Sequence, residues 1–219
     1  MTSAEIQRTT GLAVNLRSAA GATGADDLAT AIDSLDTPAQ RWQRRMPGIV
    51  NPGTQTCVLE YSGDFDSTLD AAEHDLGRLG NAVDRRGSFA MAAELLIFVP
   101  CQTPAPIRYW YCMHRRHDFS HDGYLRRYQD IHSQFGIDTD GIEGYTQWHA
   151  DPNKCAAAAG RLGTGRCSYD SISVLDIADL NVFFSAAMSS DIGERAKADE
   201  ALFVDADKSH DHILARAAQ

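Results

Sequence analysis

The sequence has no long apolar run, no excess of basic residues and no secretory leader pattern. None of its apolar stretches approaches the ~20 residues that a helix needs to cross a bilayer, so we expect no membrane-spanning segment. The formal net charge of −10 would repel a phosphate backbone, which argues against nucleic acid as a partner. The stretch MTSAEIQRTT lacks the basic and apolar regions of a secretory signal, and we expect a cytoplasmic protein.

Cofactor and metal motifs are also missing. The five cysteines are odd in number and contain no C-x-x-C pair, which favours free thiols over a disulfide framework or a structural zinc site. His114, His117 and His121 lie close in sequence, but no neighbouring carboxylate completes a ligand pattern. No G-x-G-x-x-G loop stands between a predicted strand and a helix. We therefore predict no metal and no cofactor.

The 219 residues, 43% of them hydrophobic, suffice for one large domain or two of about 100 residues. In the first half, residue patterns predict strands at 12–17, 56–61 and 92–99, with room for a short strand near 48–50. Helices are predicted after Asp26 as a cap, from Thr37-Pro38 through Trp42 to a stop at Pro47-Gly48, and over Leu69–Val83.

The second half begins after a proline-rich segment, Pro100–Pro106, which we interpret as a linker. It repeats the order of elements, with strands predicted at 107–114, 145–149, 170–176 and 210–217. Helices are predicted at 120–135, after Asp179 as a cap, and after a capping box of Asp191 and Glu194. The alanine-rich residues 152–166 form either a loop or a short helix.

The two halves therefore have similar patterns of strands and helices without evident sequence identity. Each matches a ferredoxin-like βαββαβ unit, whose sheet carries helices on one face and must bury the other. We predict an α+β fold of tandem ferredoxin-like repeats forming a single-chain barrel that mimics a dimer. We expect a structural repeat at residues 1–100, a linker at 101–106, and a second repeat with the active site at 107–219.

Several separated motifs occur in one order in the second half. They are MHRR at 113–116, FSHDGY at 119–124, RYQDIH at 127–132, GYTQWH at 144–149, YDSI at 169–172 and DEALFVD at 199–205. Together they resemble the EthD family of dimeric α+β barrel proteins, over roughly residues 107–216, with Ser171 where the family often has glycine. The first half shows none of these motifs and looks like a degenerate copy. The resemblance therefore implies one pocket per chain, in the second half, and leaves open whether two chains pair as a homodimer.

His132 is the central candidate for chemistry. It shares a helical stripe with Tyr124 and Tyr128, at offsets 0, 4 and 8, which places it on the buried side of the helix. Its expected position near the helix C-terminus favours the imidazolium, while burial favours the neutral ring. His132 is thus either a general acid/base or a core histidine that fixes the helix to the sheet, and the sequence leaves both readings open.

Other candidates surround His132 in the predicted fold. Tyr145, Gln147 and His149 alternate onto one face of a strand, which lines a pocket or forms an exposed edge. Asp170 opens the next strand and either positions a histidine or is a simple turn residue. The predicted catalytic residues are His132, His149, Asp170 and Tyr128, and the predicted substrate-binding residues are Tyr124, Tyr145, Gln147, Trp110 and Phe203.

Two functions follow from the resemblance. The first is a cofactor-independent lyase or isomerase, of dehydratase, decarboxylase or cyclase type, that acts on a hydrophobic and aromatic small molecule. In it His132 moves a proton, and His149, Tyr128 or Asp170 positions it or stabilises developing charge. The alternative is a non-catalytic accessory or ligand-binding protein of a catabolic or biosynthetic pathway. A haem role, known among more distant barrel relatives, is a third option.

Overall fold

The computed structural model describes residues 6–19, 24–43, 56–189 and 191–217. Within them, eight strands are hydrogen-bonded in the order β1-β3-β2-β8-β5-β7-β6-β4, a closed barrel of an α+β protein, as predicted. The chain divides into two compact units, each assembled from separate stretches. One unit comprises Met1–Arg8, Leu95–His149 and Ser168–Ile213, and the other comprises Thr9–Glu94, Ala150–Cys167 and Leu214–Gln219.

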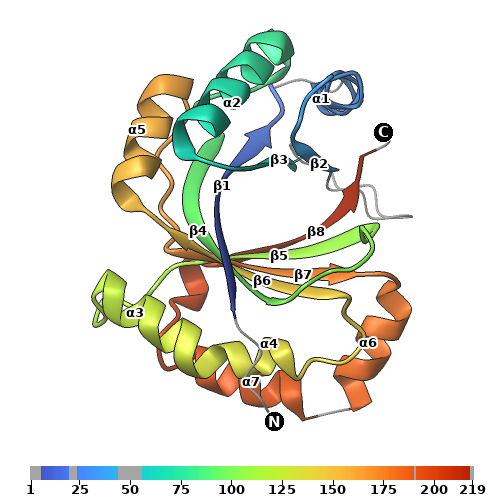
Figure 1. Ribbon diagram of the computed structural model, residues 1–219, viewed down its shortest axis with the longest axis vertical. Helices are drawn as coiled ribbons and strands as arrows, with labels where there is room; N and C mark the ends of the chain where they lie inside the picture. The colour runs from blue at the N-terminus through green and yellow to red at the C-terminus, as the bar shows by residue number, and fades with distance from the viewer. Residues whose placement is uncertain (1–5, 20–23, 44–55, 190, 218–219) are drawn as a thin grey trace. The chain divides into compact units, whose positions relative to one another are not determined.

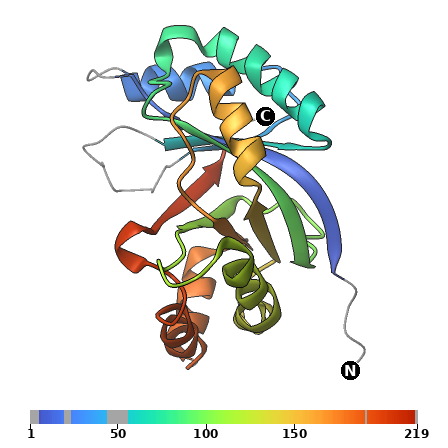
Figure 2. The same cartoon turned by 90° about the vertical axis from the view of Figure 1, so that its left-hand side faces the viewer.

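The unit that contains most of the first half is built from alternating strands and helices. Its elements are β1 (Gln7–Arg17), α1 (Gly24–Asp33), β2 (Gln40–Gln43), β3 (Thr56–Ser62), α2 (Phe65–Leu79), the 3₁₀ turn η1 (Gly80–Ala82), the start of β4 (Phe89–Val99) and α5 (Pro152–Leu162). Helix α2 begins where the Asp64 carboxylate accepts a hydrogen bond from the Ser67 amide at 3.0 Å. Helices α2 and α5 lie side by side (Figures 1 and 2).

Two predictions in this unit were wrong. The segment from Thr37 through Trp42 does not form a helix: residues 40–43 are strand β2, which pairs with β3 and places Trp42 opposite Val58. Trp42 is fully buried there. Strand pairing and burial of the indole therefore outweigh the weak helix signal that Pro38 gives.

The second error concerns the predicted cap at Asp26. Helix α1 begins at Gly24, so Asp26 lies inside its first turn. The predicted strand near 48–50 and the stop at Pro47-Gly48 lie outside the described residues.

The unit that contains most of the second half carries the candidate site. Its elements are the end of β4, β5 (Ile107–Met113), α3 (His121–Arg127), the π turn η2 (Tyr128–His132), α4 (Ser133–Ile137), β6 (Gly144–Ala150), β7 (Ser171–Ile177), α6 (Leu180–Ser189), α7 (Ile192–Glu200), the 3₁₀ turn η3 (Ala206–Lys208) and most of β8 (His210–Arg216). Strand β7 lies between β5 and β6 and runs antiparallel to both. Helices α4 and α7 pack against one another (Figure 1).

Most predicted elements of this unit are confirmed, with one cap corrected. Asp179 caps α6 by accepting a hydrogen bond from the Asn181 amide at 2.7 Å. The capping box at the start of α7 was wrong, because the Asp191 side chain makes no capping bond and instead lies 3.5 Å from the Arg195 guanidinium. Residues 101–106 carry no strand or helix and connect β4 to β5. The predicted domain boundary there stays a prediction.

A buried ion pair joins the two central strands of this unit. Arg108 on β5 lies opposite Asp176 on β7 and donates two hydrogen bonds to one carboxylate oxygen, at 2.9 and 2.7 Å. Both side chains are nearly excluded from solvent. Removing one partner of such a pair leaves the other charge buried without compensation.

We therefore expect Asp176→Ala to lower the free energy of unfolding by about 3–5 kcal/mol, measured by urea denaturation. The matched control is Asp118→Ala, which breaks the Arg116–Asp118 pair on the exposed surface. That change should leave the free energy of unfolding almost unchanged, because solvent screens an exposed ion pair. Equal effects of the two substitutions would contradict the account.

Candidate active site

A π turn in the helix after β5 positions His132. Ser120 caps this helix by accepting a hydrogen bond from the Gly123 amide at 3.1 Å, and the helix continues through α3, η2 and α4. Tyr128–His132 form the π turn, and His132 is its last residue. Such turns are rare and frequently occur at functional sites, because the extra residue changes the direction in which side chains point. The helix continues for about one turn after His132 and ends with α4 at Ile137.

His132 lies between two carboxylates of α7. Its Nδ1 is 3.0 Å from the Asp199 Oδ2, and its Nε2 is 3.4 Å from the Glu200 Oε1. Arg127, one helical turn before His132, donates a hydrogen bond to the other oxygen of Asp199. The imidazole is 7% exposed, so these contacts provide its polar environment. Asp199 therefore fixes the ring orientation, and Nε2 faces Glu200.

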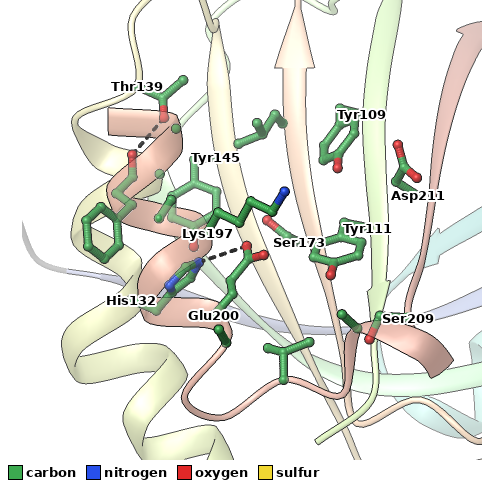
Figure 3. A pocket seen from close by; sticks show the side chains of 18 residues that line it. Tyr109, Tyr111, His132, Thr139, Tyr145, Ser173, Lys197, Glu200, Ser209 and Asp211 are labelled. Carbon is green, nitrogen blue, oxygen red and sulfur yellow. Dashed lines mark hydrogen bonds and ion pairs between the residues drawn. The ribbon is translucent and has the colours of Figure 1, made fainter. Parts of the chain in front are cut away.

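Glu200 and His132 both line a cavity of about 610 Å³. One wall is formed by strands β5 to β8 and the other by α4 and α7, as Figure 3 shows. The aromatic lining residues are Tyr109, Tyr111, Phe135 and Tyr145. A volume between about 300 and 1,000 Å³ with mainly apolar walls and a few polar groups is typical of a small-molecule site.

Helix α7 contributes a regular stripe to the cavity. The residues are Gly193, Ala196, Lys197, Glu200 and Ala201, at helical offsets 0, 3, 4, 7 and 8. Three of the five are small, so the helix leaves room for a ligand. Lys197 and Glu200 supply opposite charges, and in Figure 3 both extend from the helix toward the strands.

The tyrosines on the strand wall stay protonated at neutral pH. Burial, reinforced by the negative charge of Glu200, raises the pKa of Tyr111 to about 12. Burial also raises the pKa of Tyr145 to about 12. The Tyr145 hydroxyl accepts a hydrogen bond from the Gln147 amide at 2.7 Å, and the hydroxyls of Tyr128 and Ser173 also lie within its reach. The wall therefore carries neutral hydroxyls that can exchange such a partner for an oxygen of a ligand.

Of the residues predicted from sequence, His132 and Tyr145 line this cavity. Behind Tyr145, a chain of polar contacts follows β6: Gln147 donates to Tyr145, and its carbonyl oxygen lies 2.8 Å from the His149 Nε2. Gln147 is fully buried and His149 is 7% exposed. The interpretation of this strand as an exposed edge was therefore wrong. The contacts from Gln147 to His149 lie behind the cavity and are not part of its lining.

The remaining aromatic candidates lie outside the cavity lining. Tyr124, Tyr128 and Phe203 pack together in one buried cluster, and the Tyr124 hydroxyl is 2.6 Å from that of Ser171. Trp110 is fully buried on β5. Because side chains alternate along a strand, Trp110 faces away from the cavity that its neighbours Tyr109 and Tyr111 line.

Asp170 belongs to a separate cluster. Its carboxylate accepts hydrogen bonds from the Arg115 backbone amide at 2.9 Å and from the Arg115 guanidinium, and it lies 2.8 Å from the His121 Nδ1. Burial favours the protonated carboxyl, but the bonds from His121 and Arg115 together outweigh it and hold the pKa of Asp170 below its usual range. Asp170 does position a histidine, but that histidine is His121.

Sequence reasoning missed several residues that line the cavity or contact His132. Asp199 and Glu200 stand in the DEALFVD segment that supported the resemblance, yet their side chains were not assigned a role. Tyr109 and Tyr111 had a usable signal, since they alternate on a strand. Nothing local marked Lys197, because its direction depends on how α7 packs.

The described residues contain no group of three His, Cys, Asp or Glu side chains that could hold a metal ion. None of the five cysteines, all of which are described, takes part in a disulfide. Among the helices that the structure describes, none combines the length and apolar character needed to cross a membrane.

Comparison with known proteins agrees with this geometry. Residues 116–207, which supply His132, Asp199 and Glu200, match the EthD domain. This part of the chain is thus similar to the EthD domain. No curated protein sequence matches the chain. The EthD segment thus spans the helix and both carboxylates of the site.

Solved structures show the same fold over the whole chain. A protein from Lactobacillus acidophilus, provisionally assigned as a monooxygenase, has a TM-score of 0.55 at 7% identity, covering 96% of this chain and 95% of that one. A haem-binding protein from Thermus thermophilus gives 0.51 at 13%, covering 98% and 93%. A mutant chlorite dismutase from Candidatus Nitrospira defluvii gives 0.53 at 10%, covering 98% and 93%. The segment that matches the EthD domain therefore lies in a chain whose α+β barrel fold these structures share.

The buried state of His149 should make stability depend on pH. Burial, together with the positive charges of Arg8 and His121, lowers the pKa of His149 to about 4. The unfolded chain, with a pKa of about 6.5, binds a proton that the folded chain does not, so folding loses stability as pH falls from 6.5 toward 4. Between pH 7 and pH 5 this loss is about 2 kcal/mol, measurable by urea denaturation at both values.

His149→Gln should remove this component and shrink the loss by about 2 kcal/mol. The control is His117→Gln, which replaces an exposed histidine and should leave the loss unchanged. An undiminished pH dependence in the His149 variant would be inconsistent with a neutral buried imidazole.

Gly136 permits the close approach of the Tyr145 ring to α4. A Cβ at position 136 would lie 2.3 Å from the Tyr145 Cε1, so the ring, which lines the cavity, would have to shift. We expect Gly136→Ala to cost about 1–3 kcal/mol of stability and to reduce ligand affinity. Gly160→Ala is the control, since a Cβ there meets nothing within 4 Å. Equal stability of the two variants in thermal unfolding would refute the close contact.

Proposed function

We propose that the protein is a lyase or isomerase that binds a small aromatic molecule and moves a proton on it with its own side chains. The observation that carries this proposal is the position of His132, with Nδ1 bound to Asp199 and Nε2 beside Glu200 in the wall of an aromatic-lined cavity. A buried acid–base group held by a second residue and open to a concave site is the usual arrangement for general acid–base catalysis.

The roles follow from the distances. Asp199 accepts the Nδ1 hydrogen and holds the ring, so Nε2 is the nitrogen that exchanges a proton with Glu200 or with the ligand. Glu200 lines the cavity beside Nε2 and takes or returns the proton at the ligand. Tyr111 and Tyr145, protonated at neutral pH, donate to an oxygen on which negative charge develops.

The haem-binding structural neighbour raises the question of whether this cavity could hold haem. The contact between Nδ1 and Asp199 is one that metal-bound histidines commonly make. The Glu200 carboxylate, however, lies 3.4 Å from Nε2, where the iron and porphyrin of a histidine-ligated haem would have to lie. The side chains as placed do not fit haem, and absence of a Soret band after incubation with haemin would agree with this.

His132→Gln should lower turnover by about 10²–10⁴ and leave the fold intact. Because the substrate is not identified, a panel of aromatic metabolites is incubated with the protein, and binding and product are both followed by mass spectrometry. Asp199→Asn should reduce turnover less than His132→Gln, since it disturbs the orientation of the ring only. His117→Gln, outside the cavity, is the control.

The outcomes separate catalysis from simple binding. Conversion that survives in the His132 variant would overturn the assignment of this residue. Binding of ligands without conversion of any would favour the alternative, an EthD-type accessory protein that carries a small molecule.

A further inference from the structure

Lys197 is a cation in the cavity without a carboxylate partner. Its side chain lines the cavity one helical turn before Glu200, a spacing at which lysine and glutamate commonly pair. Here Glu200 turns instead to His132, at 3.4 Å from Nε2. Within the described part of the chain, the Lys197 ammonium has no ion-pair partner. Its charge is therefore available to a ligand.

The direction of the Lys197 side chain supports this availability. In Figure 3 it extends across the cavity, with its nitrogen between the helix and the strand that bears Tyr109, and away from His132. The carboxylate of Asp211, on β8, lines the opposite wall and is exposed. The Lys197 ammonium thus faces the same cavity as the His132–Glu200 pair, from a second position on the helical wall.

The cavity favours a flat molecule. Tyr109 and Tyr111 present rings on the strand wall, while Gly193 and Ala196 leave the facing helix almost without side-chain volume. Aromatic rings gain most from offset stacking against other rings, and small residues allow the second face of a ligand to approach the helix.

We infer that the cavity binds a planar ring compound with a carboxylate or phenolate oxygen, and that Lys197 binds this oxygen. The inference rests on the proposed function and adds the substrate class. A charged oxygen held by Lys197 would orient the ring so that its other end reaches Glu200 and His132. Lys197 is then a specificity-determining residue, while His132 and Glu200 act on the proton.

A cationic ligand is the main competitor, since Glu200 and Asp211 both line the cavity. Glu200 already faces the imidazole of His132. Lys197 and Asp211 are both exposed, and among the described residues neither has an ion-pair partner, but Lys197 stands one helical turn from Glu200 while Asp211 stands on the opposite wall. An anionic group bound by Lys197 therefore places the ligand beside the pair that transfers the proton.

The test uses three ring probes of the same shape: naphthoate, its neutral amide, and naphthylmethylammonium. Affinities are measured by isothermal titration calorimetry. We expect the wild-type protein to bind naphthoate about tenfold more tightly than the amide and the ammonium, because a charged hydrogen bond replaces a neutral one. Lys197→Met should abolish the preference for naphthoate, and Lys197→Arg should retain it. Lys154→Met, an exposed lysine outside the cavity, is the control.

Several results would overturn the inference: equal binding of naphthoate and the amide, tighter binding of the ammonium, an unchanged preference in Lys197→Met, or failure of all three probes to bind. Circular dichroism checks that each variant is folded. If the wild-type protein prefers naphthoate and loses this preference in Lys197→Met, while His132→Gln keeps full turnover of a substrate, the proposed function fails and the role of Lys197 stands. The two failures are therefore distinguishable.

Discussion

A buried imidazole must find a partner for each ring nitrogen, and the site is arranged around this requirement at His132. The π turn brings the ring to the inner side of the helix, and α7 supplies Asp199 to one nitrogen and Glu200 to the other. Arg127 binds the far oxygen of Asp199, so the helix holds α7 by two side chains. The side chains that orient the ring therefore also connect the two helices of the cavity wall.

The other features of the cavity depend on the same contact. With α7 held in place, its small residues face the aromatic strand wall and leave a space of about 610 Å³. Gly136 allows Tyr145 to lie against the helix, and the polar chain through Gln147 to His149 fixes the tyrosine from behind. Lys197 is left with its charge unpaired by the described residues because Glu200 is engaged by the histidine.

The sequence predicts the fold well because its strands and helices have strong periodic patterns and clear caps. The helix over 120–135, the strand at 145–149 and the EthD resemblance pointed to the elements that line the cavity and to His132, which lies in its wall. The prediction from sequence failed at Trp42, because this short segment carries both helix and strand signals. Burial against strands that are distant in sequence decides its secondary structure. A cap was also misjudged at Asp191, since cap geometry depends on backbone angles that the sequence does not specify.

The partners of His132 could not be predicted in the same way. Asp199 and Glu200 are 67 and 68 residues away, and adjacent acidic residues at the end of a helix ordinarily point to solvent. The sequence suggested a catalytic role for Tyr128, His149 and Asp170 because they are polar residues at positions expected to be buried. Burial alone, however, does not distinguish the wall of a cavity from the core behind it. Only packing shows that Asp170 serves His121, and that Tyr109 and Tyr111 face the cavity where Trp110 does not.

The account depends on which nitrogen of His132 carries the fixed hydrogen. Nitrogen-15 NMR of histidine-labelled protein measures this directly, with the His132 signals assigned by their loss in His132→Gln. We predict a hydrogen on Nδ1, held by Asp199 and disturbed in Asp199→Asn, with Nε2 as the nitrogen whose signal changes when a ligand enters the cavity. A neutral ring with its hydrogen fixed on Nε2 and an Nδ1 signal unaffected by Asp199→Asn would contradict the proposed proton transfer.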